Sequence, residues 1–279
     1  MPTKVSSRTS NILDVSPDVR ARLDARDPDH IRAWWPRIRW SFDLWHRPTV
    51  TGIENIPAEG PSLVVSNHSG GLMSLDAPIL FDAFVRRFGY QRKAYLLSHD
   101  VIFHTPVAWE LGKWGMIPAA PDMARAALAE GAVVLVFPGG DRDVYRPTTH
   151  GATIDFGGKT GYVRLACDAG VPIVPVVSIG GQETQLFLSR GEGIANLLRA
   201  PKWARIRVWP IALGVPFGPL YMMNAPLPVK LSTRVLEPID LGSATPSDDT
   251  IAKIDNEVRS SMQDALSQLA RERKDPLLG

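Results

Sequence analysis

The chain has 279 residues, of which 44% are hydrophobic and 22% are charged, and its formal net charge at pH 7 is +2. This length suits one large core with a small N-terminal appendage, and the apolar content is typical of globular proteins. The small net charge, without long basic blocks, excludes the electrostatic footprint of a nucleic-acid-binding protein. The single cysteine excludes an intrachain disulfide.

The N-terminal part of the chain is predicted to form a separate segment over residues 1–48, before a main domain over residues 49–279. The first 28 residues are expected to be loosely ordered. A helical pattern rich in tryptophan and arginine begins near His30, and Pro36 predicts either a kink or a helix start close to it. The apolar side chains that recur at helical spacing are Ile31, Trp34, Trp35, Ile38, Phe42 and Trp45.

Two interpretations of this segment stay open. Tryptophan and arginine together suit the boundary between lipid headgroups and hydrocarbon, which predicts a helix lying on a membrane. The alternative is a helix that simply packs on the main domain. No apolar run reaches the roughly 20 residues that a spanning helix needs, and the N-terminus lacks the apolar core of a signal peptide.

From Gly60 onward, short apolar runs alternate with helical patterns. This alternation predicts an α/β fold with a central, largely parallel or mixed sheet flanked by helices. Strands are predicted near 61–66, 93–98, 132–137 and 172–178. Helices are predicted over 77–88, 105–113, 121–130, 157–169 and 181–198, and from about Ser247 to Lys274.

The motif Asn-His-Ser-Gly-Gly at residues 67–71 places a histidine in a glycine-rich loop after the first of these strands. In open α/β sheets, ligands bind at the carboxyl ends of strands. Asp76 is predicted to cap the next helix, with Pro78 in the first turn. Because a histidine oriented by an aspartate can deprotonate a hydroxyl group, His68 and Asp76 are candidates for a general base and its partner. The alternative is a turn with a surface histidine.

A second glycine-rich motif, Phe-Pro-Gly-Gly-Asp-Arg-Asp, occupies residues 137–143 after the strand 132–136. Glycine lets the backbone approach a ligand, and the Arg142 guanidinium can bind a phosphate or carboxylate with two hydrogen bonds. The alternative is an ordinary turn with surface charges. A third element, Gly-Val-Pro-Ile-Val-Pro-Val at 170–176, indicates by itself only a turn and a buried strand.

The stretch from Trp203 to Met223 is apolar but is interrupted by several prolines and glycines. It cannot span a bilayer alone, because proline leaves backbone groups unpaired in hydrocarbon. We expect it to line an apolar groove or to dip into a lipid surface.

In this order and at these distances, the three motifs resemble those of the glycerolipid acyltransferase superfamily, the lysophosphatidic acid acyltransferase (PlsC-like) enzymes. The family's first motif is Asn-His with a downstream Asp. Its third is Phe-Pro-Glu-Gly-Thr-Arg-Ser, and its fourth is a Val-Pro-Ile-Val-Pro-Val type strand. The resemblance covers roughly residues 52–239 and is closest to a divergent branch. The matching residues are Asn67, His68, Asp76, Phe137, Pro138, Gly140, Arg142 and Val171 to Val176.

The departures from the family pattern concern the acidic and basic positions. Asp76 lies eight positions after His68, and Met73 occupies the usual acid position. Gly139 replaces the Glu of the third motif. The family's second motif corresponds to residues 115–121 here, and Pro121 replaces its usual Arg. Because that Glu and Arg help to hold glycerol phosphate in family members, the resemblance implies acyl transfer more firmly than a phosphate-bearing acceptor. The double-glycine form is similar to neutral-lipid acyltransferases, which suits an uncharged acceptor.

The resemblance implies an O-acyltransferase domain over 49–279 that moves a fatty acyl group from acyl-CoA or acyl carrier protein to a hydroxyl of a glycerolipid or related lipid. His68 would act as general base with Asp76, without a covalent enzyme intermediate, metal or tightly held cofactor. Arg142 is the preferred contact to the acceptor. The expected substrate-binding residues are Asn67, Ser69, Gly70, Gly71, Gly139, Gly140, Arg142, Arg146 and Lys159.

The expected partners are the acyl donor, a lipid acceptor and a membrane surface, but no nucleic acid. We expect a peripheral, monotopic protein on the cytosolic face of a membrane, contacting lipid through residues 34–45 and 209–223. One alternative is a non-catalytic lipid-binding protein that kept the fold while the His-Asp geometry lapsed. Another is a lipid esterase using Ser66 or Ser69, which the lack of a Gly-x-Ser-x-Gly elbow disfavours.

Overall fold

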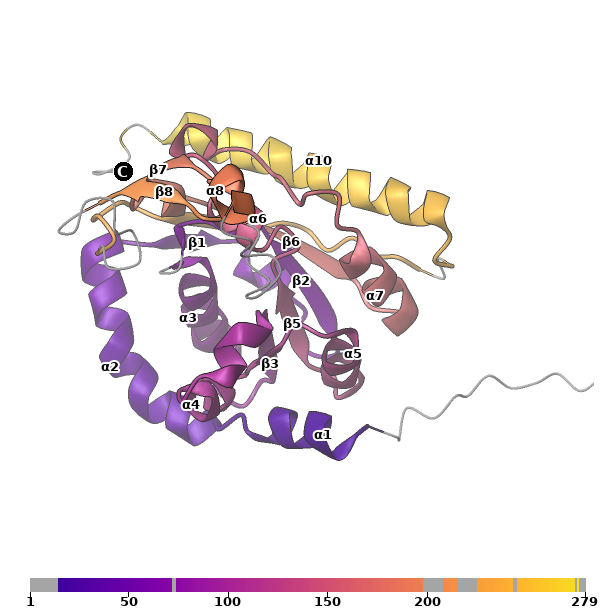
Figure 1. Ribbon diagram of the computed structural model, residues 1–279. Coiled ribbons are helices and arrows are strands. Elements are labelled where there is room, and N and C mark those ends of the chain that lie inside the picture. Colours follow the sequence, from indigo (N-terminus) through magenta and orange to yellow (C-terminus); the bar gives the residue numbers. More distant parts are fainter. Residues whose placement is uncertain are drawn as a thin grey trace, which may run out of the picture.

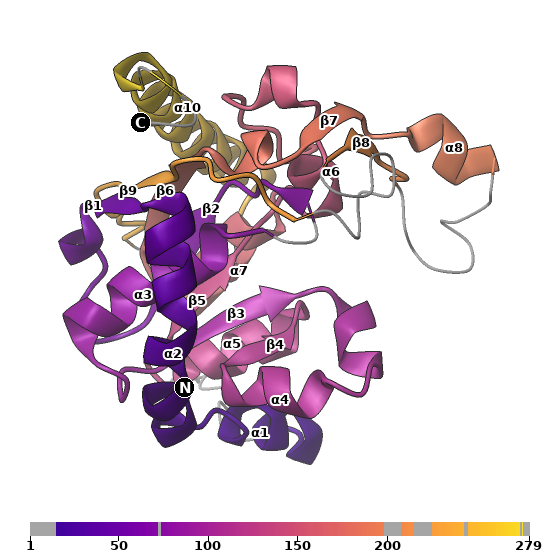
Figure 2. The same ribbon diagram turned by 90° about the vertical axis from the view of Figure 1, so that its left-hand side faces the viewer.

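A central sheet carries helices on both of its faces (Figures 1 and 2). The computed structural model describes residues 15–71, 74–197, 208–214, 225–242, 245–273 and 275. This arrangement confirms the predicted α/β class with a mixed sheet. In sheet order, the strands are β1 (Thr49–Thr51), β9 (Ser232–Val235), β6 (Ile173–Ile179), β2 (Ser62–Ser66), β5 (Val133–Val136), β3 (Ala94–Ser98) and β4 (Met116–Pro118).

The strands from β6 to β4 run parallel, and the pair β1 and β9 runs antiparallel to them. Every residue of β2 and β6 is buried, as expected for parallel strands covered on both faces. Such strands have nearly continuous apolar sequences, which is why the sequence predicts them well. The carboxyl ends of β6, β2 and β5 meet at one edge of the sheet, where ligands bind in this class of fold.

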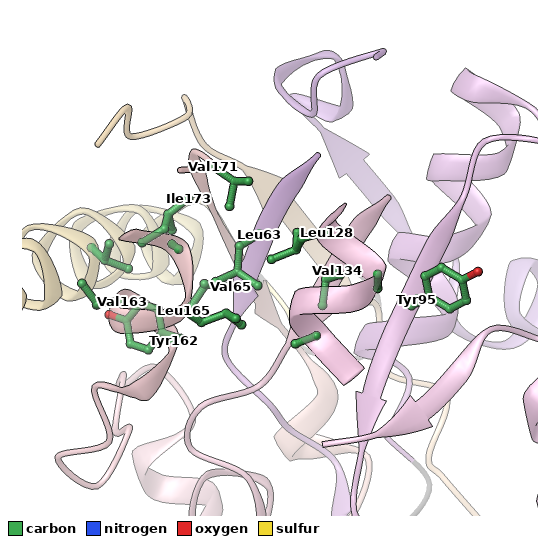
Figure 3. Close-up of a cluster of buried hydrophobic side chains, with 14 of the residues drawn as sticks. Leu63, Val65, Tyr95, Leu128, Val134, Tyr162, Val163, Leu165, Val171 and Ile173 are labelled. Atoms are coloured by element: carbon green, nitrogen blue, oxygen red, sulfur yellow. The ribbon is translucent and has the colours of Figure 1, made fainter. Parts of the chain in front are cut away.

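Successive strand residues point to opposite faces of the sheet, and each face packs against its own helices. Leu63 and Val65 pack into one cluster (Figure 3), and Val64 packs into the other. Burying one such side chain contributes about 1.5–3 kcal/mol. The first face is covered by α1 (Pro17–Asp24), α5 (Pro121–Ala129), α7 (Gly161–Ala169) and α10 (Asp248–Glu272), the second by α2 (Pro28–His46) and α3 (Asp76–Phe88).

The N-terminal segment is more ordered than the sequence predicts. The expectation of loose order is wrong for α1, which buries Val19 and Leu23 in the first cluster, whereas residues 1–14 lie outside the described part. Pro36 lies inside α2 and does not start a helix. Tertiary packing explains both results, because the inward faces of α1 and α2 contribute to the two cores.

The predicted helix over 181–198 is wrong in its central part. A 3-10 helix (Gly181–Glu183) leads into β7 (Leu186–Ser189), and the described α-helix of this region is α8 (Glu192–Leu197). β7 pairs antiparallel with β8 (Ile211–Leu213), so that Phe187 and Ala212 face inward. A strand partner so distant in the sequence leaves no local periodicity that would reveal it.

Short helices complete the described part of the chain. The helices predicted over 105–113 and 157–169 begin later than expected, as α4 (Ala108–Lys113) and α7. Within the described residues, none of the helices combines the length and the apolar character needed to cross a bilayer. Residues 203–207 and 215–223 of the apolar stretch lie outside the described part. The remaining short helices are α6 (Asp141–Val144) and the 3-10 helices Ile53–Asn55, Asp100–His104 and Thr148–His150.

Candidate active site

His68 stands just beyond the carboxyl end of β2. Its imidazole stacks on the ring of Phe137, with 4.1 Å between the ring centroids and an angle of 20° between the planes. Phe137 follows β5, the parallel neighbour of β2. The His68 side chain is 23% exposed. The stacking therefore covers one face of the ring but leaves part of the imidazole accessible.

Ser74 and Asp76 both contact the Nδ1 atom of His68. Nδ1 lies 3.4 Å from Asp76 Oδ2 and 3.1 Å from Ser74 Oγ, and Ser74 Oγ donates to Asp76 Oδ2 at 3.2 Å. Because an ionised carboxylate only accepts hydrogen bonds, the Ser74 hydroxyl proton points to Asp76 and its lone pair accepts from Nδ1. These contacts assign the proton to Nδ1 and leave Nε2 as the basic nitrogen.

Asp76 is the first residue of α3, and its carboxylate turns back onto the preceding loop. It is 2% exposed and accepts hydrogen bonds from the Ser69 N–H at 2.6 Å and from Ser69 Oγ at 2.9 Å. The prediction that Asp76 caps the helix is wrong, since Leu75 holds that position without a side-chain cap. The carboxylate satisfies donors of the loop instead, and the eight-residue interval still brings it to His68.

Gly70 and Gly71 follow Ser69 in the loop after β2. Their φ angles of 89° and 69° are strained for other residues. A Cβ on Gly71 would lie only 2.8 Å from the Phe187 ring, because Phe187 of β7 packs closely against this loop. The Gly70 N–H donates to Gln182 Oε1 at 3.2 Å. This amide is therefore already engaged and would have to leave Gln182 to contact a substrate.

Asn67 and Ser69 face the protein interior. Asn67 donates to the Ser178 carbonyl and accepts from the Ser178 N–H, both at 2.8 Å, which extends the pairing of β2 with β6. Both residues are buried, and Ser69 Oγ is bonded to Asp76. This geometry favours structural roles over the substrate contacts predicted from sequence. It also disfavours Ser69 as an esterase nucleophile, because its hydroxyl is buried.

Gly139 and Gly140 belong to the loop after β5. A Cβ on Gly139 would overlap Asp143 and lie 2.8 Å from the Asp155 carbonyl oxygen. The packing of Asp143 therefore explains why glycine stands where the family pattern has Glu. Lys159 Nζ donates to the Gly139 carbonyl at 3.3 Å, so the predicted Lys159 site lies beside this loop.

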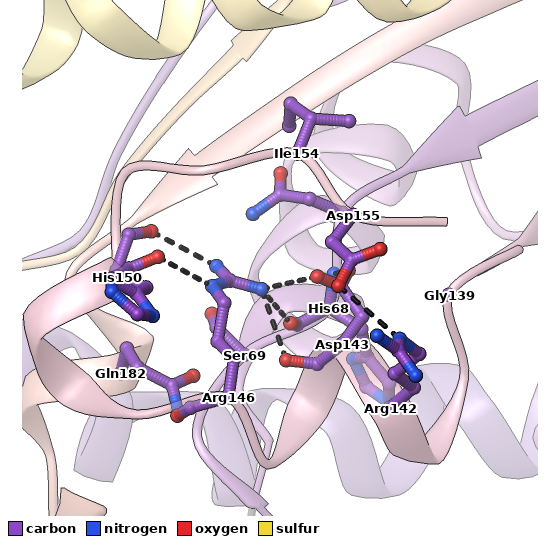
Figure 4. A network of polar contacts seen from close by, with 12 residues as sticks. His68, Ser69, Gly139, Arg142, Asp143, Arg146, His150, Ile154, Asp155 and Gln182 are labelled. Carbon is purple, nitrogen blue, oxygen red and sulfur yellow. Dashed lines mark hydrogen bonds and ion pairs between the residues drawn. The ribbon is translucent and has the colours of Figure 1, made fainter. Parts of the chain in front are cut away.

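Arg142 and Arg146 have opposite environments (Figure 4). The Arg142 side chain is 46% exposed and pairs with Asp155 at 3.3 Å and with Glu192 at 3.5 Å. The Arg146 side chain is 1% exposed, and its guanidinium donates to carbonyls that include that of His68. Arg142 can still reach a ligand. The burial of Arg146 favours a structural role over the predicted substrate contact.

An apolar cavity of about 220 Å³ lies between the sheet and the helices α2 and α3. Ala77 and Pro78 line it directly after Asp76, and Leu135 lines it two residues before Phe137. A cavity lined by apolar side chains suits a hydrocarbon chain. Its other walls are formed by Trp35, Ile56, Val64, Leu80, Phe81, Phe84, Ala94, Tyr95, Leu96, Trp114, Met116 and Val133.

Sequence reasoning missed three residues of this site, Ser74, Asp143 and Gln182. Ser74 carries a weak signal, since it is a hydroxyl residue between the candidate His and Asp. Asp143 stands in the glycine-rich motif at residues 137–143, but nothing local indicates that it bonds to the His68 backbone, 75 positions away. Gln182 lay in a region predicted as a helix. Asp143 and Gln182 act through long-range contacts that periodicity does not reveal.

Comparison with known proteins decides the family. A family model described as Acyltransferase matches residues 47–179. An uncharacterized protein of Mycobacterium tuberculosis is 30% identical over 249 residues, which cover 88% of this chain and 67% of that protein. The chain belongs to the glycerolipid acyltransferase superfamily. Lipid acyl transfer is therefore the general activity of this acyltransferase.

Relatives whose names state an activity share lower sequence identity with this chain. The chain is 27% identical over 214 residues to the chicken (Gallus gallus) DGAT1/2-independent enzyme synthesizing storage lipids, covering 75% of this acyltransferase and 57% of that enzyme. The human (Homo sapiens) protein of that name is 25% identical over 221 residues, with 78% and 61% covered. The acyltransferase thus spans less than two thirds of these relatives.

Among solved structures, the acyltransferase is similar to the 1-acyl-sn-glycerophosphate (LPA) acyltransferase PlsC from Thermotoga maritima. The sequence identity is 17%, the TM-score is 0.47, and the match covers 90% of this chain and 79% of that one.

Proposed function

We propose that this acyltransferase moves a fatty acyl group from acyl-CoA, or from acyl carrier protein, to a hydroxyl of a glycerolipid or related lipid, with His68 as general base. The observation that carries the proposal is the contact of Nδ1 with Ser74 and Asp76, which leaves Nε2 basic. A base placed in this way typically accelerates proton transfer by about 10²- to 10⁴-fold.

In the proposed reaction, Nε2 takes the proton of the acceptor hydroxyl while the hydroxyl oxygen attacks the thioester carbonyl. The carbonyl oxygen carries the negative charge of the tetrahedral intermediate. Collapse of this intermediate breaks the carbon–sulfur bond, and the imidazolium returns its proton to the leaving thiolate. The products are an ester and a free thiol. Asp76 stabilises the imidazolium while it exists.

The apolar cavity is the proposed site of the acyl chain. It lies beside Ala77 and Pro78, immediately after Asp76, and its walls are apolar. A chain seated there would place its thioester end near the imidazole. Binding the chain in a dry cavity also supplies orientation, which lowers the barrier to transfer.

Two observations support an uncharged acceptor over a phosphate-bearing one. Gly139 supplies no side chain, and Arg142 is already paired with Asp155 and Glu192. The name of the chicken relative, an enzyme synthesizing storage lipids, agrees with a neutral-lipid acceptor.

The outer face of α2 is the proposed membrane contact. Trp34, Trp40, Leu44 and Trp45 are exposed there, while Trp35 on the inner face is buried. Arg37 lies 5.4 Å from the centroid of the Trp34 ring, a combination that suits the headgroup boundary. We propose peripheral attachment to a cytosolic membrane face, with Trp209 of the second apolar stretch also exposed.

The deciding test of activity is product analysis by mass spectrometry. Purified protein is incubated with acyl-CoA and, separately, with diacylglycerol, lysophospholipid and glycolipid acceptors. We expect one class of acylated product that depends on His68. If no acceptor is acylated from either acyl-CoA or acyl carrier protein, although the protein binds lipid, the non-catalytic alternative replaces the proposal.

Flotation with anionic vesicles tests membrane attachment. We expect the wild type to float and the Trp40→Ala, Leu44→Ala double variant to float less, because about 25 cal/mol is lost for each Å² of apolar surface withdrawn from lipid. Lys253→Ala on the exposed face of α10 is the matched control. A wild type that never floats would contradict the proposal.

A further inference from the structure

Asp143 and Arg146 hold both backbone groups of His68 (Figure 4). The His68 N–H donates to Asp143 Oδ2 at 2.6 Å, and Arg146 Nη1 donates to the His68 carbonyl at 2.9 Å. The two side chains also form an ion pair with each other, and they are 0% and 1% exposed. One buried ion pair therefore hydrogen-bonds to both the N–H and the carbonyl of His68, the proposed base.

All three nitrogens of the Arg146 guanidinium form hydrogen bonds inside the protein. Its Nε donates to the His150 carbonyl at 3.1 Å, and Nη2 donates to the Gly151 carbonyl at 3.0 Å. Nη1 donates to the carbonyls of His68 and Asp143. These bonds hold the neighbouring loops together, so the structure favours a stabilising role for the Arg146 charge.

Burying this pair is costly, because both charges leave water. Burial raises the pKa of Asp143 to about 6, while Arg146 and the His68 N–H act against that rise. An apolar pair of similar size would fill the space at lower cost, but it would bond neither backbone group of His68. The hydrogen bonds to His68 are what a charged pair adds at this place.

Gln182 adds further hydrogen bonds to the loop after β2. Gln182 accepts from the Gly70 N–H and donates to the Arg146 carbonyl. Asp76 holds Ser69 between these two points. Residues 68, 69 and 70 are thus each fixed by a different buried side chain.

We propose that Asp143 and Arg146 are positioning residues for acyl transfer, which hold the His68 peptide so that Nδ1 stays on Ser74 and Asp76. The inference rests on the proposed role of His68 as base. Neither residue touches the substrate. Loss of either one lets the imidazole leave its partners, so the turnover step suffers while substrate binding does not.

The test compares two buried carboxylates. Asp143→Asn keeps the size and an oxygen that accepts from His68, but it removes the charge that pairs with Arg146. Asp255→Asn is the matched control, because Asp255 on α10 is also buried and accepts from Tyr162 and Arg259 at 2.8 Å each. We expect Asp143→Asn to lower kcat by about 10- to 100-fold with little change in KM for acyl-CoA. Asp255→Asn, at a similar loss of Tm, should keep kcat.

A second readout does not depend on activity. In nitrogen NMR of protein labelled at histidine, His68 should be protonated at Nδ1 in the wild type and should populate both tautomers in Asp143→Asn. If that variant does not fold, Arg146→Lys, which keeps the charge but not the planar fork, should change kcat and the spectrum in the same direction.

The outcomes separate the two proposals. A fully active His68→Ala variant overturns the role of His68 itself, whatever Asp143 does. An inactive His68→Ala with a fully active Asp143→Asn overturns only the positioning role. A kcat loss in Asp143→Asn that Asp255→Asn matches, with an unchanged His68 spectrum, also overturns it.

Discussion

Two glycine-rich loops lie at the same edge of the sheet, but His68 in one and Asp143 in the other have opposite environments. The loop after β2 keeps His68 partly exposed, with Nδ1 in contact with Ser74 and Asp76. The loop after β5 buries Asp143 completely against the backbone of the first loop. The comparison teaches that a glycine loop at a strand end is not by itself a reactive site. Its role depends on whether the polar group stays partly exposed or is buried against a neighbouring peptide.

The largest effect should come from the first loop. Replacing His68 by Ala should lower turnover by about 10²- to 10⁴-fold, or about 3–5 kcal/mol, because the general base is lost. Initial rates of ester formation measure this, with Tm as a check of folding. His150→Ala is the control, since its side chain is exposed and only its carbonyl bonds to Arg146. Wild-type rates in His68→Ala would show that the first loop does not supply the general base.

In the second loop, Gly139→Ala should lower the stability of the protein. Its Cβ would overlap Asp143, so we expect a loss of about 1–3 kcal/mol in the free energy of unfolding. Chemical denaturation measures it. Gly161→Ala at the start of α7 is the control, because its Cβ would meet open space and alanine favours a helix. Equal stability of both variants and the wild type would show that Asp143 is not tightly packed.

Ser74→Ala probes how the base is oriented. Removing one buried hydrogen bond costs about 0.5–1.5 kcal/mol, so kcat should fall roughly threefold to tenfold. The control is Ser62→Ala in β2, whose Oγ has no hydrogen-bond partner within the described residues. Unchanged kcat in Ser74→Ala would show that Asp76 alone orients the imidazole.

Arg142→Ala should have the smallest effect. Exposed ion pairs contribute about 0.2–1 kcal/mol, so stability should barely change, and kcat/KM for an uncharged acceptor should stay within about threefold. Arg164→Ala, another exposed arginine paired with an aspartate, is the control. A rise of tenfold or more in acceptor KM in Arg142→Ala alone would show that the second loop also binds substrate, and would favour a phosphate-bearing acceptor.

The sequence by itself determined the elements whose signal is local. The strands β2, β5 and β6 have continuous apolar runs, and the helices α3 and α10 have a clear apolar face. His68 and Asp76 were identifiable as candidates because glycine loops at strand ends are common ligand sites. Side-chain periodicity and turn chemistry act within a few residues, so they can be predicted without a partner.

Only the tertiary structure decided which polar groups are exposed and which are buried. Arg142 and Arg146 are four positions apart in the sequence, yet one is exposed and the other is enclosed by carbonyls that include one 78 positions away. β1, β4 and β8 are three residues long, too short for a period of two to be recognised, and β7 depends on β8 for its pairing. Burial and pairing are properties of the packed chain, because they depend on neighbours that the local sequence does not contain.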